Sequence, residues 1–175
     1  GHEYKVTGGA GTVTVLFRNR GYTHQDKPFD LAKGEREFTR YAGYIFQPEV
    51  RPTTEIKYHS DAAPGTRYVF VDGTLKSEAN FYTVVRSVAN VQPTQANYVD
   101  MHRHNCDTQH IAIGTGPELT GLKIEFQIRD DKIVVESPVG VNIPAGTPHS
   151  QRIIEGAGHF FNFVPKSFYN DGLMC

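Results

Sequence analysis

Histidines gather in one short stretch, residues 101–110, which reads MHRHNCDTQH and holds three of the eight histidines of the chain. Imidazole is the commonest metal ligand among protein side chains. Residues two apart on a strand point to the same face, so His102 and His104 could both reach one cation. The stretch could therefore bind a metal, although histidines on half-exposed strands also serve as ordinary hydrogen-bonding side chains.

Two other segments could complete such a site. A hairpin over residues 105–108 would bring Gln109 back beside the two histidines, and strand alternation would then turn His110 to the opposite face. Far downstream, in IPAGTPHSQR, His149 follows a turn that contains Pro and Gly and precedes another expected strand. A ligand from this second stretch would have to approach from across a β-sandwich.

The elements that would position these side chains are short strands with alternating polar and apolar residues, most of them closed by Gly, Pro, Asn or Asp. With eleven Phe, nine Tyr, seventeen Gly and ten Pro, the composition is also typical of strands joined by tight turns. The pattern predicts an all-β protein, an antiparallel β-sandwich. Its strands are expected at residues 12–17, 67–71, 80–88, 110–114, 122–128, 132–137, 140–144, 150–154 and 159–164.

The first third of the chain is less regular. Residues 28–46 have apolar residues at helical spacing and predict a short helix, which Gly34 weakens. Residues 47–66 carry Pro, Thr and Gly with little periodicity, as expected of a long surface connection. We therefore expect one domain, with residues 1–65 as an extension packed on a β-barrel formed by residues 66–175.

The overall composition excludes several classes of function. Lys and Arg number 18 against 19 Asp and Glu, so nothing predicts attraction to nucleic acid or to an anionic membrane. The sequence has no apolar run long enough to span a bilayer and no signal-peptide pattern. Cys106 and Cys175 are the only cysteines, which favours a reducing compartment, so a cytoplasmic protein is expected. The opening Gly1-His2 is treated as a tag remnant.

Two motifs in this sequence resemble those of the cupin superfamily. The first has the order His-x-His-x4-Gln-x6-Gly, with Gln where the family usually has Glu, and the second has Gly followed by Pro-x-Gly-x-x-His. Gly140 stands nearer Pro144 than the family pattern prefers, and Ile153 takes a place where Asn is common. The matching residues are His102, His104, Gln109 and Gly116 in the first motif and Gly140, Pro144, Gly146 and His149 in the second.

The resemblance implies a jelly-roll β-barrel that holds a divalent transition metal through His102, His104, Gln109 and His149. Three imidazoles and a neutral amide would leave the full charge of the cation in place, which makes it a stronger Lewis acid than with the usual glutamate. Nitrogen ligands suit Fe(II), Mn, Ni, Co or Zn, and the resemblance to non-heme iron cupins favours Fe(II).

Three functions follow from this resemblance. The leading one is an Fe(II) dioxygenase or other oxygenase that acts on a small polar molecule. An isomerase, lyase or hydrolase would use the metal without O2, and a non-enzymatic cupin would only bind a small molecule. The resemblance also makes a homodimer a reasonable expectation.

Other residues could assist catalysis. Tyr98 and Gln151 share strand parity with His102 and His149, so they are the predicted catalytic residues that line the pocket. Arg103 is a weaker candidate for a carboxylate clamp, because it alternates away from the histidines. Further residues considered in this way are Tyr82, Arg86, Cys106, Glu125 and His159, each of which could equally be a packing or surface residue.

Overall fold

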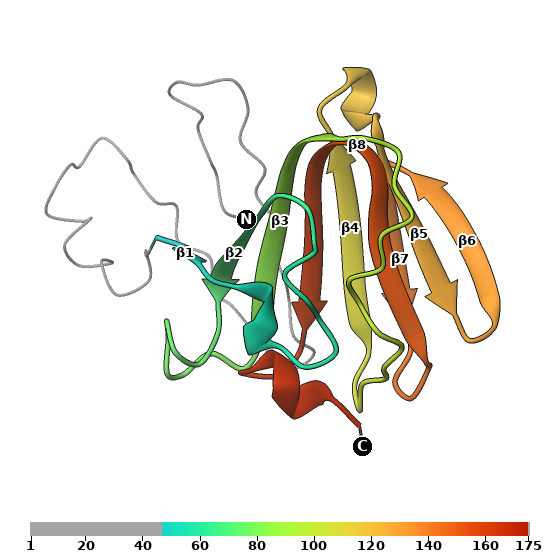
Figure 1. Ribbon diagram of the computed structural model, residues 1–175. Helices are drawn as coiled ribbons and strands as arrows, with labels where there is room; N and C mark the ends of the chain where they lie inside the picture. Colours follow the sequence, from blue (N-terminus) through green and yellow to red (C-terminus); the bar gives the residue numbers. More distant parts are fainter. Residues whose placement is uncertain (1–46, 175) are drawn as a thin grey trace, which may run out of the picture. The chain divides into compact units, whose positions relative to one another are not determined.

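A computed structural model describes residues 47–174 (Figure 1). The strand predicted at residues 12–17 and the helix predicted at residues 28–46 lie outside the described residues. The chain divides into two compact units, Gly1–Phe46 and Gln47–Cys175, and the predicted boundary after residue 65 stays a prediction. The segment that follows Gln47 contributes the short strand β1 (Glu49–Val50), which pairs with β2 (Thr66–Val71).

Within residues 47–174, eight strands pair throughout in the antiparallel sense, so the predicted all-β antiparallel fold class is confirmed. One path of the sheet runs β1-β2-β3-β8-β4-β7, and β5 joins it by pairing with both β8 and β6. The remaining strands are β3 (Tyr82–Val91), β4 (Thr108–Gly114), β5 (Leu122–Ile128), β6 (Asp131–Glu136), β7 (Val139–Ile143) and β8 (His149–Val164).

The last strand connects the two halves of the barrel. Two separate strands were predicted at residues 150–154 and 159–164, but β8 is one strand of 16 residues. Its first half pairs with β5, and its second half lies between β3 and β4 (Figure 1). The change of partner falls at Gly156, whose φ of +100° and whose approach to the Gly121 carbonyl leave no room for a Cβ. Glycine therefore lets one strand serve both halves.

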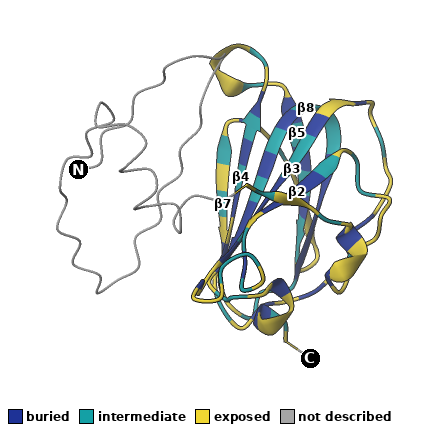
Figure 2. Cartoon of the chain, turned by 90° about the vertical axis from the view of Figure 1, so that its left-hand side faces the viewer, coloured by how far each residue is buried: buried dark blue, intermediate teal, exposed yellow. Residues whose placement is uncertain are grey.

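Buried residues, dark blue in Figure 2, alternate with more exposed ones along the strands. The larger apolar cluster consists of Val88, Val91, Ala112, Leu122, Ile124, Phe126, Ile143, Ile153 and Phe160. A second cluster, near the C-terminal end of the chain, consists of Ile56, Val69, Tyr82, Val84, Val164 and Tyr169. No helix among residues 47–174 is long and apolar enough to cross a lipid bilayer.

Two single-turn helices stand at the same end of the barrel, where η5 (Tyr169–Gly172) lies close to the C-terminus and η3 (Thr53–Glu55) lies near it (Figure 1). A third, η4 (Pro117–Leu119), lies at the opposite end. The segment that carries His102 and His104 runs toward the first of these ends before β4 begins. The candidate site therefore lies under η5.

Candidate metal centre

Three histidines converge inside the barrel. His102, His104 and His149 each offer a ring nitrogen, and these three atoms lie within 4.8 Å of one another. The ring centroids are 4.6 Å apart for His102 and His149, and 5.1 Å apart for His102 and His104. All three side chains are buried. His149 follows His104 by more than 40 positions in the sequence, and the two motifs thus meet at one point.

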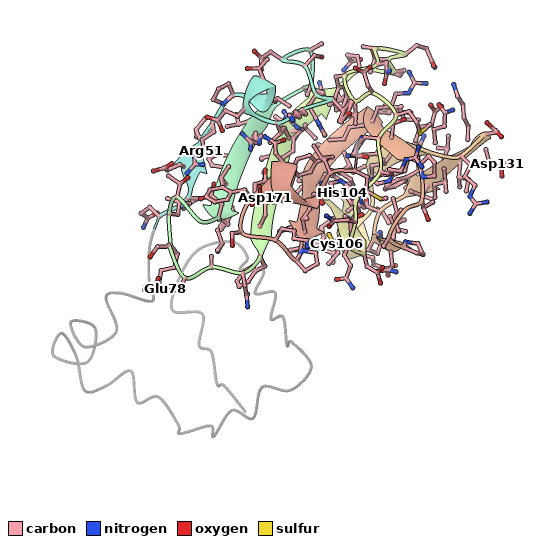
Figure 3. The ribbon with its side chains drawn as sticks, turned by 90° about the horizontal axis from the view of Figure 1, so that it is seen from below. Arg51, Glu78, His104, Cys106, Asp131 and Asp171 are labelled. Atoms are coloured by element: carbon pink, nitrogen blue, oxygen red, sulfur yellow. The ribbon has the colours of Figure 1, made fainter. Side chains whose placement is uncertain are left out.

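Backbone pairing explains this convergence. The N–H of His102 donates to the carbonyl of His149 over 3.0 Å, and the N–H of His149 donates back over 2.8 Å. The carbonyl of His104 accepts a 2.7 Å bond from the N–H of Gly146. Backbone hydrogen bonds thereby join the second motif to the first at two points, Gly146 and His149. Viewed from the end that carries η5, His104 lies toward the middle of the described part and Asp131 at its far edge (Figure 3).

Two of the rings are fixed in one tautomer. His102 Nδ1 is 2.8 Å from the carbonyl of Asp100, and His149 Nδ1 is 2.9 Å from the carbonyl of Thr147. A carbonyl only accepts, so Nδ1 of each ring carries the hydrogen and Nε2 keeps its lone pair. Metal-binding histidines commonly have this arrangement, in which the remote nitrogen donates to a carbonyl. Each Nε2 atom therefore keeps the lone pair that a cation would need, and that of His149 has no hydrogen-bond partner among the described residues.

Burial keeps the cluster neutral. It lowers the pKa of His102 to about 3 and that of His104 to about 4, and it also lowers the pKa of His149. Hydrogen bonds to backbone carbonyls raise the pKa of His102 and of His149, but the effect of burial is larger. A metal ligand must be unprotonated, so these imidazoles need not release a proton at neutral pH before they bind a cation.

An unpartnered atom marks the same place. His149 Nε2 is buried and has no hydrogen-bond partner among the described residues. Buried polar atoms are satisfied in most native proteins, so each exception calls for an explanation. Three nitrogen donors, two of them with fixed lone pairs, fit a transition-metal ion and not the oxygen-seeking Ca²⁺ or Mg²⁺.

The prediction that Gln109 is a ligand is wrong. Gln109 is exposed, whereas its neighbours on β4, Thr108 and His110, are almost fully buried. The alternation of β4 is thus shifted by one residue from the predicted phase, and His110 faces inward instead of outward. Its ring stacks on Phe160 at 5.6 Å and lies 6.0 Å from His149. The cluster therefore has three imidazoles and no amide, so a cation bound there would still keep its full charge.

Sequence reasoning also missed two residues that enclose the cluster. The hydroxyl of fully buried Tyr169, in η5, donates to His102 Nε2 over 2.8 Å. The ring of His59 lies 5.4 Å from that of His102 and 5.2 Å from that of Tyr169. Both come from segments outside the predicted strands, where no periodic signal exists to find them.

The predicted catalytic residues share one cavity. Tyr98 and Gln151 are both buried and line a small cavity that also contacts His59. The Tyr98 hydroxyl accepts a 2.6 Å bond from the N–H of Ile153, and burial raises the pKa of Tyr98 to about 12. The amide oxygen of Gln151 is buried and unpartnered among the described residues. Their catalytic role stays a prediction, but their placement in one cavity suits it.

The weaker candidates lie elsewhere. Arg103 is exposed, as strand parity predicted. Glu125 pairs with Arg152 at 2.9 Å, and His159 pairs with Ile113 and Ser87 in the sheet without joining the histidine cluster. Cys106 is a half-buried free thiol whose pKa is raised by burial, so it has no feature of an activated nucleophile.

Comparisons with known proteins concern the fold. No protein-family model matches the sequence, and no curated protein matches it. Among solved structures, KdgF from Halomonas sp. is 14% identical, with 70% of this chain and 98% of that chain covered and a TM-score of 0.42. Hydroxypropylphosphonic acid epoxidase from S. wedmorenis is 10% identical over 66% of this chain and 54% of that one, with a TM-score of 0.41.

A Bacillus subtilis oxalate decarboxylase with Mn(II) centres is 14% identical, with a TM-score of 0.44. The match covers 74% of this chain but only 31% of the decarboxylase. The site itself is supported by the histidine geometry of this chain.

Proposed function

We propose that this protein is a metal-dependent enzyme that acts on a small polar molecule, with Fe(II)-dependent oxygenation as the leading activity. The observation that carries the proposal is the convergence of three buried, neutral imidazoles from two distant motifs on one point. His102, His104 and His149 would hold the ion. The bound metal would supply Lewis acidity and, as Fe(II), one-electron chemistry with O2.

The chain's own residues would do the rest. Carbonyls of Asp100 and Thr147 fix the tautomers of His102 and His149, which keeps the ligand atoms pointed inward. Tyr169 and His59 cover the cluster and keep water from it. Tyr98 and Gln151 line the adjoining cavity, where they could orient a substrate through hydrogen bonds. A set of three neutral ligands leaves positions free for substrate.

A second candidate activity uses the metal without O2. It is favoured by the Tyr169 hydroxyl, a buried proton donor 2.8 Å from a ring nitrogen of the cluster. Burial raises the pKa of Tyr169 well above its usual value, so the phenol is protonated at neutral pH and could give a proton to a metal-polarised carbonyl. Such a reaction would be an isomerisation, elimination or hydrolysis.

The test begins with the metal content of protein purified without chelators, compared with that of His102→Ala. We expect near-stoichiometric metal in the wild type and loss of metal in the variant. Oxygen uptake by the Fe(II)-loaded protein with candidate substrates then separates the two activities, because the second would proceed anaerobically. A wild-type protein that fails to bind any of Fe(II), Mn, Ni, Co or Zn would contradict both.

A further inference from the structure

Among the described residues, two arginines and no carboxylate line the small cavity beside the histidine cluster. We call it the inner cavity; the residues that matter to its chemistry are His59, Arg67, Arg86, Tyr98, Gln151 and Asn162. No Asp or Glu is among the described residues that line it. It adjoins the cluster because the His59 ring lies 5.4 Å from that of His102, and because Gln151 follows His149 at the same strand parity on β8.

Arg86 is the main source of positive charge in this cavity. Its guanidinium donates to Thr53 Oγ1 over 2.6 Å and to the carbonyls of Pro64 and Ala63 over 3.0 and 3.5 Å. All three acceptors are neutral, and no carboxylate pairs with Arg86 within residues 47–174. Burial lowers its pKa, yet a guanidinium stays protonated at neutral pH. Three fixed neutral partners thus orient the cation, and the carboxylate of Asp61 acts on it only from a distance, without a direct ion pair.

Arg67 places a second guanidinium on the same wall. It is almost fully buried and donates to Tyr82 Oη over 2.8 Å and to the carbonyl of Pro52 over 2.7 Å. Among the described residues it forms an ion pair with Glu55, which is 3.3 Å away and has a side chain that is 43% exposed, so water screens that pair. The Nε of Arg67 is buried and has no partner in the described part of the chain.

The remaining walls suit a small organic molecule. The amide oxygens of Gln151 and Asn162 are buried without partners among the described residues, so they have hydrogen-bonding capacity left for a ligand. Val84, Val99 and Phe160 supply apolar surface between these polar groups. A few fixed polar groups on an otherwise apolar wall are typical of small-molecule sites, and the cavity volume of about 40 Å³ limits the ligand to a very small molecule or to one group of it.

We propose that the inner cavity binds the carboxylate of a small organic acid, and that Arg86 is its principal anchor. Arg86 is half-buried and has no paired carboxylate among the described residues, so an anionic ligand could complete its hydrogen bonding and supply a counter-charge. Arg67 adds to the field, while Gln151 and Asn162 contact the uncharged part. This assignment moves the clamp from Arg103, which is exposed, to Arg86. It names the substrate class of the proposed enzyme and rests on that function.

The experiment measures binding of propionate, and of its neutral isostere propionamide, to the metal-free protein by the NMR signals of the arginine Nε–H groups. We expect saturable binding of propionate that shifts the Arg86 signal, with propionamide at least about tenfold weaker. Arg86→Met should weaken propionate binding by about tenfold or more, and Arg86→Lys, which keeps the charge, should weaken it less. The matched control Arg103→Met should bind like the wild type.

Equal binding of acid and amide, or undiminished binding to a folded Arg86→Met, would overturn the assignment. If Arg86→Met does not fold, the wild type provides the test. An Arg86 Nε–H signal that does not shift when propionate is added would also overturn the assignment. If inorganic phosphate binds and propionate does not, the carboxylate assignment is wrong and the cavity binds a different oxyanion. Metal content of the same samples separates the two proposals, because Arg86→Met should keep its metal while His102→Ala should lose metal and still bind propionate.

Discussion

The two ends of the barrel interior are built by the same strands but differ in chemistry. On β8, Ile153 belongs to the apolar cluster, whereas His149 and Gln151 lie toward the polar end. On β4, Ala112 is part of the apolar cluster and His110 lies next to His149. One end holds the halves together through apolar packing, and the other end leaves polar atoms unpartnered.

The difference shows how a β-barrel can combine stability with a site. Apolar burial contributes about 25 cal/mol per Å², so the apolar end stabilises the fold without any ligand. Unpartnered buried polar atoms cost free energy instead, and they gather at the end covered by η5. Such groups are tolerated because the apolar end offsets them, and a bound cation and anion would satisfy them.

The largest effect is expected from His149→Ala. Removal of one of three ligands should lower metal affinity by more than the 10–100-fold that loss of a residue supporting a ligand typically costs. Without metal, the variant should also be less stable than the wild type, because a fully buried ring and its hydrogen bond to the Thr147 carbonyl are lost. Titration calorimetry with Co(II) or Fe(II) would measure the affinity. His159→Ala, on the outer side of β8, is the matched control and should bind metal normally.

Acidification should destabilise the polar end in particular. Burial lowers the folded-state pKa of His59 and His104 to about 4 and that of His102 to about 3, against about 6.5 in the unfolded chain. The unfolded state therefore binds more protons, and stability present above pH 6.5 is lost as the pH falls toward 3–4. Each histidine should lower the free energy of unfolding by roughly a few kcal/mol at most. Urea unfolding of metal-free protein between pH 8 and 4 would measure it, and a stability that stays constant over that range would contradict the prediction.

A substitution that creates a cavity at the apolar end should lower stability but leave metal affinity unchanged. Ile124→Ala should lower the free energy of unfolding by about 2–5 kcal/mol, since Ile124 is completely buried in the larger cluster. Its metal affinity should stay near that of the wild type while the protein remains folded. Urea unfolding and metal titration of the same sample provide the two readouts. A loss of metal affinity as large as in His149→Ala would show that the two ends are not separable.

Tyr169→Phe should change stability and metal affinity less than Ile124→Ala or His149→Ala does, and the two quantities should change in opposite directions. The variant loses one buried hydrogen bond, worth about 0.5–1.5 kcal/mol of stability. Because metal binding at His102 Nε2 must displace that bond, the variant should bind metal slightly more tightly, by up to about tenfold. Parallel metal titrations of both proteins would show it. A marked fall in affinity would instead make the Tyr169 oxygen a ligand.

The smallest effect is expected from Gln109→Ala. The side chain is exposed on the outer face of β4, and surface substitutions usually change stability by within about 0.5 kcal/mol. Metal affinity should be unchanged. A clear loss of metal in this variant would restore Gln109 as a ligand and contradict the observed strand phase. The companion variant His110→Ala, on the inner face, should perturb the site more.

Much of this arrangement was readable from sequence, because local alternation depends only on neighbouring residues. The period-two pattern of LKIEFQI predicted β5 with its bounds, and the turn motif PAGTPH placed His149 at the start of β8. The two motifs also identified His102, His104 and His149 as the residues that converge. Each of these is a signal contained in a few adjacent residues.

Other features depended on contacts between distant segments. The phase of β4 is fixed by its pairing with β7 and β8, so a shift of one residue exchanged Gln109 for His110 at the inner face. Tyr169 and His59 reach the cluster from irregular segments, and Arg86 faces the cavity because residues 53–64 fold back over β3. Sequence by itself determined which ligands were available, whereas tertiary packing decided which side chains surround them, because those contacts leave no local pattern.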